Sequence, residues 1–210
     1  MSTESAQPTR RVESPTQRGR RTRAALDAAA RAVIARKGIL AATVADIAAE
    51  AGRSAASFYN YYDSKEAMVR EWALRFHVEA QQRAATVTRH GLTNRERAQQ
   101  VAAAHWRTYR NRLAEMISVS QLAMVNEDFA RHWDEMCALP IAFITETVKR
   151  AQAEGYGAGD DPQLIAVAIV AMFNQFCYVQ LSGGQCPDDA ACITTLANIF
   201  YRAIYGEESS

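Results

Sequence analysis

The sequence predicts an all-α protein of about nine helices, three of them short and near the N-terminus. Apolar residues recur at helical spacing through most of the chain after residue 19, and the later segments are rich in alanine. No segment shows the alternation of apolar and polar residues that is typical of a half-buried strand. A chain of 210 residues then forms one large helical domain or two smaller ones.

The charge is unevenly distributed, although the formal net charge is only +1. Residues 1–70 hold 12 Lys and Arg against 7 Asp and Glu, whereas the rest of the chain holds 12 against 16. A basic beginning before an acidic remainder is expected when one end of a protein contacts a polyanion. Residues 1–19 lack periodic apolar positions and are predicted to form a disordered basic arm.

Targeting, membrane and metal signals are weak in this sequence. No uninterrupted apolar run approaches the roughly 18 to 20 residues of a membrane span, and the N-terminus lacks the apolar region of a secretory signal. We therefore expect a cytoplasmic protein without a membrane partner. Cys137, Cys177, Cys186 and Cys192 form no C-x-x-C pair, which favours reduced, buried thiols over a redox or metal site. No metal and no cofactor is expected.

Capping signals delimit the first helices. The first helix is predicted from a candidate N-cap at Thr22 to a C-terminal glycine at Gly38. The second opens at Thr43 with Asp46 three residues later, a variant of the capping box, and ends at Gly52.

A third helix of barely two turns is predicted after Ser54, and Ser64 is the candidate N-cap of a long helix from Lys65 to about Val87. A short helix, a glycine turn and a second short helix form a helix-turn-helix, whose second helix lies in the DNA major groove. Residues 20–66 are therefore the predicted DNA-binding domain, and residues 67–210 the remaining domain.

The third helix has two different faces when its residues are spaced at 100°. Phe58, Tyr62 and Ala55 share one face, which is predicted to pack on Ile47 and the first helix. This face would hold the short helix in place.

The opposite face of the third helix is small and polar, as a surface facing a groove must be. It consists of Ala56, Ser57 and Asn60. Tyr59 and Tyr61 flank this face, where a phenol reaches phosphate oxygens on either side of a groove. Core packing is the alternative for the two tyrosines. Asn60 is either a surface amide or a base contact, since an asparagine can pair with adenine.

Cationic side chains surround this motif. Lys65 lies in the first turn of the following helix, where a bound phosphate would offset its unfavourable position against the helix dipole. Arg18, Arg20, Arg21 and Arg23 lie around the start of the first helix. They either contact phosphates or an adjacent minor groove, or belong to a solvated tail.

Residues 43–69 resemble the signature of the tetracycline-repressor (TetR) family of bacterial regulators. The similar parts are Thr-Val, Ile-Ala, Ala-Gly, the serine-capped helix, Phe-Tyr-x-Tyr-Tyr and Ser-Lys-Glu. The resemblance implies a homodimer with a three-helix DNA-binding domain and a domain of about six helices that holds an inducer pocket. It implies DNA contacts at Thr43, Val44, Ala55, Ala56, Ser57, Tyr59, Asn60, Tyr61 and Lys65. Arg53, where the family often has a small apolar residue, is expected to add a phosphate contact.

The second domain contains an amide pair, Asn174 and Gln175, inside an otherwise apolar helix. A buried amide needs a partner, so the pair either orients a small ligand or bonds across a dimer interface. The last two predicted helices, about Asp161–Leu181 and Asp188–Tyr205, have more apolar faces than a monomer needs. We expect them to form a four-helix dimer interface.

The second domain is also similar, more weakly, to the actinobacterial regulators of ethionamide activation. That subgroup has a long channel lined by aromatic residues, although Ala171 replaces an asparagine found there, so ligand preference need not carry over. The candidate ligand-binding residues are Trp106, Trp133, Phe143, Asn174, Tyr178 and Phe200. Each of these aromatic residues has ordinary core packing as its alternative.

Together these observations predict a dimeric repressor that a small apolar or amphipathic effector releases from a palindromic operator. An enzyme is not expected, because the sequence has no glycine-rich phosphate loop, H-E-x-x-H, G-x-S-x-G or Cys/His nucleophile spacing. The alternative is a helical small-molecule carrier or interaction module without DNA binding.

Overall fold

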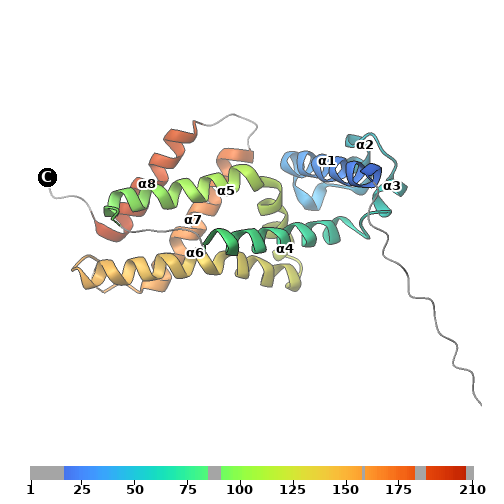
Figure 1. The fold of residues 1–210 in the computed structure, drawn as a ribbon. Helices are drawn as coiled ribbons and strands as arrows, with labels where there is room; N and C mark the ends of the chain where they lie inside the picture. Colours follow the sequence, from blue (N-terminus) through green and yellow to red (C-terminus); the bar gives the residue numbers. More distant parts are fainter. Residues whose placement is uncertain (1–16, 85–90, 158, 183–187, 207–210) are drawn as a thin grey trace, which may run out of the picture.

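The computed structural model describes residues 17–84, 91–157, 159–182 and 188–206, which form eight helices and no strand. The helices are α1 (Gln17–Ala41), α2 (Val44–Glu50), α3 (Ala55–Tyr59), α4 (Lys65–Ala84), α5 (Asn94–Ala123), α6 (Glu127–Ala153), α7 (Pro162–Ser182) and α8 (Asp189–Tyr205). Figure 1 shows α1, α2 and α3 at one end, called the head below, and α5 to α8 at the other, called the body. Helix α4 runs from the head along the body (Figure 1). The predicted all-α class is confirmed.

Two helices are interrupted. Gly38 breaks α1 with φ 74° and ψ 164°, a conformation that favours glycine, and one more turn follows it. Arg112 breaks α5 with φ −134° and ψ 28°. The count of eight is close to the predicted nine, and the break at Arg112 divides α5 into two helical segments.

The predicted caps of α2, α3 and α4 are present. The Thr43 hydroxyl accepts from the Asp46 N–H, and the Asp46 carboxylate accepts from the Thr43 N–H, which completes the capping box. Ser54 and Ser64 each accept from the backbone N–H three residues later. These bonds satisfy N–H groups that a helix start leaves without partners.

The predicted start of the first helix was wrong. Helix α1 begins at Gln17, and the Thr22 hydroxyl donates to the carbonyl of Arg18 at 3.1 Å inside the helix. A threonine hydroxyl can bond four residues back as well as cap, so its identity did not fix the boundary. Residues 17–19 of the predicted arm are therefore helical, and residues 1–16 lie outside the described residues.

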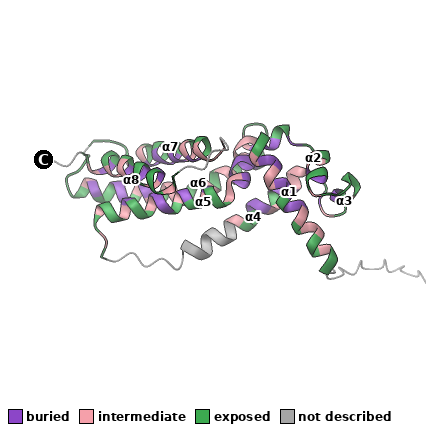
Figure 2. Cartoon of the chain, turned by 90° about the horizontal axis from the view of Figure 1, so that it is seen from above, coloured by how far each residue is buried: buried purple, intermediate pink, exposed green. Residues whose placement is uncertain are grey.

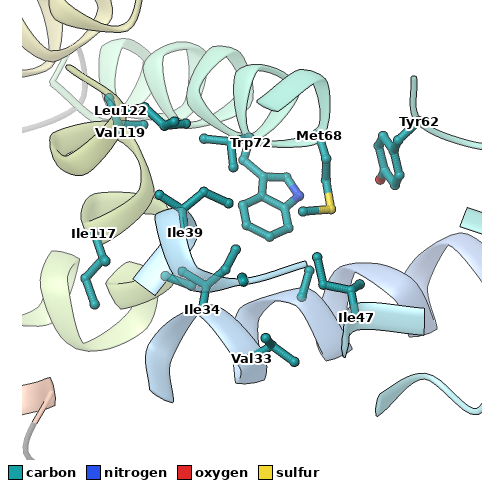
Figure 3. Close-up of a cluster of buried hydrophobic side chains, with 14 of the residues drawn as sticks. Val33, Ile34, Ile39, Ile47, Tyr62, Met68, Trp72, Ile117, Val119 and Leu122 are labelled. Atoms are coloured by element: carbon teal, nitrogen blue, oxygen red, sulfur yellow. The ribbon is translucent and has the colours of Figure 1, made fainter. Parts of the chain in front are cut away.

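The first hydrophobic core joins the head to the body. Ile34 and Ile39 of α1 meet Trp72 of α4, and Ile117 and Leu122 of α5 close the cluster (Figure 3). All five side chains are at most 4% exposed. This core runs across residue 66, where the division between the two domains stays a prediction.

The second core lies among α5, α6, α7 and α8, with Trp106, Phe173, Leu196 and Phe200 almost fully buried. Burial of such large apolar side chains contributes roughly 1.5–3 kcal/mol each. Leu113, Trp133 and Met136 pack against both cores and so connect the body to the first core.

Helix α7 has a large exposed apolar face. Its exposed side chains include Leu164, Val167, Tyr178 and Val179, and Figure 2 shows exposed residues along this helix. Among the described residues it is the helix long and apolar enough to cross a membrane, with a mean hydropathy of 1.8 over 18 residues of which 28% are buried. This mean does not contradict the statement about uninterrupted runs, because Asn174 and Gln175 interrupt the apolar residues of α7.

Candidate nucleic-acid interface and effector cavity

Two buried aromatic side chains hold α3 in place. Phe58 is fully buried and Tyr62 is 3% exposed, and their ring centroids lie 5.5 Å apart. Both were predicted to face inward. Ala55 was predicted to share that face, but it is exposed. A helical wheel gives the direction of a side chain and not whether another element lies there, and the first turn of α3 has no cover on that side.

The outer side of α3 is accessible. Ala56, Asn60 and Arg53 are exposed, Tyr59 is 56% exposed, and Ser57 is half-buried. The predicted polar face is therefore open to a partner.

A polar hollow of about 300 Å³ lies between this face and the start of α1. It is lined by Arg18, Gly19, Thr22, Arg53, Ser57, Asn60 and Tyr61. Two guanidinium groups, hydroxyls and an amide are donors suited to phosphate oxygens and base edges. Tyr61 is half-buried and packs against the first core, so its ring belongs partly to the fold.

A buried carboxylate lies behind α3 and was missed by sequence reasoning. The Tyr62 hydroxyl donates to Asp27 Oδ1 at 2.6 Å, and Trp72 Nε1 donates to the same oxygen at 3.2 Å. Burial and the bond to Asp27 raise the pKa of Tyr62 to about 12. The available signal was an acidic residue next to Leu26, on the apolar side of the first helix. Asp27 therefore ties α1 to Tyr62, which follows α3, and to Trp72 of α4.

Arg23 belongs to the same network. Its Nε donates to the Tyr62 hydroxyl oxygen at 3.1 Å, its guanidinium lies 5.1 Å from the Tyr62 ring centroid, and it pairs with Glu71 of α4. The bond to Tyr62 is the main cause that raises the pKa of Arg23. Its expected DNA contact stays a prediction, and the observed partners give it a role in fixing α1 to α4.

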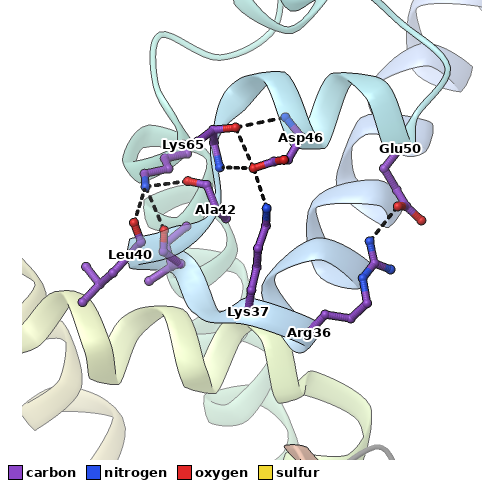
Figure 4. Close-up of polar contacts among 9 residues, drawn as sticks. Arg36, Lys37, Leu40, Ala42, Asp46, Glu50 and Lys65 are labelled. Atoms are coloured by element: carbon purple, nitrogen blue, oxygen red, sulfur yellow. Dashed lines mark hydrogen bonds and ion pairs between the residues drawn. The ribbon is translucent and has the colours of Figure 1, made fainter.

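Lys65 is also bonded differently from the sequence-based expectation. Its Nζ donates to the carbonyl oxygens of Ile39 at 2.8 Å, Ala42 at 2.8 Å and Leu40 at 3.4 Å (Figure 4). An ammonium has three donors, and all three point at the end of α1, where positive charge is favourable. Lys65 thus closes the C-terminus of α1, which sequence spacing could not reveal.

The start of α2 is fixed by charge. Lys37 Nζ lies 2.7 Å from Asp46 Oδ2, and the bonds to Lys37 and Thr43 lower the pKa of Asp46 well below its usual range (Figure 4). Thr43 is exposed, whereas Val44 is half-buried against the first core. Of the two, only Thr43 presents most of its surface to a partner.

The body contains two adjoining hollows of about 540 and 570 Å³ between α5, α6 and α7. Helix α4 contributes Phe76 to the larger one. Their shared wall consists of Tyr109, Met116, Cys137, Val170 and Asn174. Each has the volume of a small-molecule site.

Four of the six predicted ligand-binding residues line these hollows. Trp133 and Tyr178 line the smaller one, Phe143 the larger one, and Asn174 both. The Asn174 Nδ2 also contacts Cys137 Sγ at 3.8 Å.

Trp106 and Phe200 line neither hollow, contrary to prediction. They are 0% and 1% exposed and belong to the second core, with Trp106 next to Phe176 and Phe200 next to Phe173. Other core side chains enclose them, so no surface remains for a ligand. Helical periodicity predicts that both side chains point inward. It does not show whether they meet other core side chains or a cavity.

His105 was missed and lines the larger hollow. Its ring stacks on Tyr109 with centroids 5.3 Å apart, and its buried Nε2 has no hydrogen-bond partner. Burial lowers the pKa of His105 to about 4, against a smaller opposing effect of Asn174, so the imidazole is neutral at pH 7. A single histidine beside Trp106 in an alanine-rich run was the only signal in the sequence.

Gln121 connects the smaller hollow to the head. Its side chain lines that hollow, and its Oε1 accepts from the Ile39 N–H at 3.0 Å, next to the break at Gly38. A Cβ on Gly38 would lie 2.6 Å from this oxygen. Arg31 of α1 bonds Glu115 of α5 at 2.9 Å and adds a second connection.

An exposed helix-turn-helix joined to a helical bundle with hollows is an arrangement that suits a DNA-binding regulator. Residues 26–72 match the family model of the bacterial regulatory proteins of the tetR family. This match covers most of the head and the first part of α4.

Solved structures share the fold. A TetR-like transcriptional regulator from Rhodococcus sp. RHA1 aligns with a TM-score of 0.65 at 20% identity, over 89% of this chain and 97% of that one. A putative regulator from Saccharomonospora viridis in complex with choline gives 0.64 at 20%, over 86% and 95%. The regulator FadR from Bacillus subtilis in complex with stearoyl-CoA gives 0.58 at 19%, over 89% and 100%. Comparison with the curated proteins gives no match.

Proposed function

We propose that the protein is a cytoplasmic, non-enzymatic repressor that a small apolar or amphipathic effector releases from a palindromic operator. The observation that carries this proposal is that α3 has one buried face and one exposed polar face. Phe58 and Tyr62 fix it from inside, while Ser57 and Asn60 stay open beside Arg53. Such a surface supports base contacts by the helix and phosphate contacts around it.

The repressor acts as a homodimer through α7 and α8. The exposed apolar face of α7, together with Ile199 of α8, supports this interface, because a soluble monomer rarely exposes so much apolar surface. Two-fold symmetry would place the two recognition helices roughly 34 to 36 Å apart, or further on a distorted site.

The effector binds in the two hollows of the body. Proteins of this fold occur in complex with choline and with stearoyl-CoA, which supports a small-molecule site here. Gln121 lines one hollow and bonds the head, so an occupant that moves it would favour a different head position. The effector can shift this equilibrium only by its difference in affinity for the two states.

The proposal is tested by DNA binding of the full chain. Fragments of the source genome are selected, the bound sites are footprinted, and the affinity is measured from 50 to 200 mM salt. We expect an inverted repeat and an affinity that falls steeply with salt, because phosphate contacts release counterions. An absence of any footprint, with small molecules still bound, would instead support the helical carrier.

A further inference from the structure

The larger hollow has no charged wall residue among the described residues. All 16 residues that line it are uncharged, since His105, the one side chain among them that could become a cation, is neutral at pH 7. Aromatic and aliphatic side chains dominate the wall, from Phe76 to Phe173. A charged ligand group placed here would lose its hydration without gaining a counter-charge.

The smaller hollow has one charged wall residue, Asp134 of α6. A neighbouring groove of about 500 Å³ shares Asp134 and also contains Glu146, but Glu146 is paired with Lys149 at 2.7 Å. Asp134 is exposed, as Glu135 is, and it has no cationic partner among the described residues. The described walls of both hollows contain no Lys or Arg. Among the described wall residues, the formal charge that a ligand meets is therefore the negative charge of Asp134.

Aromatic side chains line the same hollow as this carboxylate. Trp133 precedes Asp134 on α6, and Tyr178 contributes from α7. An ammonium group is attracted both by a carboxylate and by the faces of aromatic rings. A carboxylate or phosphate at this position would be repelled by Asp134.

The junction of the hollows offers a neutral polar group. The Asn174 amide lies in the shared wall next to Cys137, between the carboxylate side and the uncharged side. It can hydrogen-bond a hydroxyl or amide in the middle of an elongated molecule. The order along the cavity is thus negative, neutral polar and apolar.

We propose that the effector is a monocationic amphiphile, with its ammonium group at Asp134 near Trp133 and Tyr178 and its uncharged tail in the larger hollow. This inference rests on the proposed function and specifies the ligand class of the same site. It excludes fatty acids and their phosphate-bearing derivatives as preferred effectors.

The test compares three ligands of equal chain length by isothermal titration calorimetry with the full chain at pH 7. Decylamine, decan-1-ol and decanoate differ in charge and share the tail. Decylamine should bind most tightly, and decanoate about tenfold or more weakly, because attraction at Asp134 is replaced by repulsion. Equal affinities, tighter binding of decanoate, or no binding of any of the three would overturn the proposal.

Charge variants locate the effect. Asp134→Asn should remove most of the preference, and Asp134→Lys should invert it so that decanoate binds better. Glu135→Gln is the matched control, because Glu135 is the next carboxylate on α6, is exposed and lines neither hollow. A preference for decylamine that survives Asp134→Asn contradicts the proposal.

DNA footprinting on the same preparations separates the two proposals. A footprint without the charge preference rejects only the ligand class. A charge preference without a footprint rejects the repressor and leaves the cation site in place.

Discussion

Head and body treat their polar groups in opposite ways. At the head, Asp27 of α1 accepts hydrogen bonds from two side chains, and Lys65 of α4 donates to three carbonyl oxygens at the end of α1. Both charged groups are therefore paired within the protein. In the body, the His105 Nε2 has no partner and Asp134 has no cation among the described residues. A satisfied network fixes one geometry, whereas the buried His105 nitrogen has no partner and belongs to a residue that lines a hollow. Under the proposed function, this difference would give a rigid DNA-binding surface and an adaptable effector cavity.

The largest expected effect separates an anchor of the head from its reading surface. Phe58→Ala should lower the free energy of unfolding by about 3–5 kcal/mol, because it removes a fully buried ring. Tyr59→Ala should change it by less than about 0.5 kcal/mol, because Tyr59 is 56% exposed. Urea denaturation measures the free energy of unfolding of both variants. Tyr59→Ala should bind DNA more weakly although its stability is nearly that of the native protein. Equal stability of the two variants would contradict the distinction between Phe58 as a buried anchor and Tyr59 as an exposed surface residue.

The contact between head and body is probed at Gly38. Gly38→Ala should lower the free energy of unfolding by about 3 kcal/mol, since it strains the backbone at φ 74° and places a Cβ against Gln121. Gly52→Ala is the control, because a Cβ there meets nothing within 4 Å and only the backbone cost of about 1 kcal/mol applies. Thermal unfolding measures the stability of both variants. Equal losses of stability would contradict the close approach of Gly38 to the Gln121 side chain.

Lys65 is bonded inside the protein, whereas Arg53 is exposed, so replacing each of them should have different effects. Lys65→Met should cost about 2 kcal/mol of stability, since it removes charge-assisted bonds to the end of α1. Arg53→Met should leave stability nearly unchanged and lower the salt dependence of DNA binding by one phosphate contact. The account of Lys65 fails if its replacement changes the salt dependence and leaves the unfolding midpoint unaltered.

The smallest expected effect is a pH dependence of the body. The pKa of His105 is about 4 in the folded chain and about 6.5 in the unfolded one. Between these values only the unfolded state binds the proton, so stability falls as the pH is lowered through this range, by about 1 kcal/mol at pH 5.5. Urea titrations at pH 7.5 and 5.5 should show this loss, and His105→Gln should reduce it. If His105→Gln lost as much stability between pH 7.5 and 5.5 as the native protein, groups other than His105 would be responsible.

Local features of this fold followed directly from the sequence. The capping box at Thr43, the caps at Ser54 and Ser64, and the inward Phe58 and Tyr62 depend only on neighbours within a few positions. Such short-range rules act before any tertiary contact exists.

The remaining features depend on contacts between distant segments. Lys65 reaches the end of α1, and Gln121 meets an N–H group of the same helix 82 positions earlier in the chain. Trp106 and His105 are sequence neighbours, yet one is core and the other lines a cavity. Periodicity assigns a face to each residue, but only the packed structure shows what that face meets.

The central claim is that the exposed face of α3 reads DNA sequence, and Asn60 tests it most directly. Native protein and Asn60→Ala would each select binding sites from a pool of randomised duplexes. The account predicts a changed base preference at one position of each half-site, with little change in stability, because Asn60 is exposed. An identical selected sequence for both proteins would contradict it.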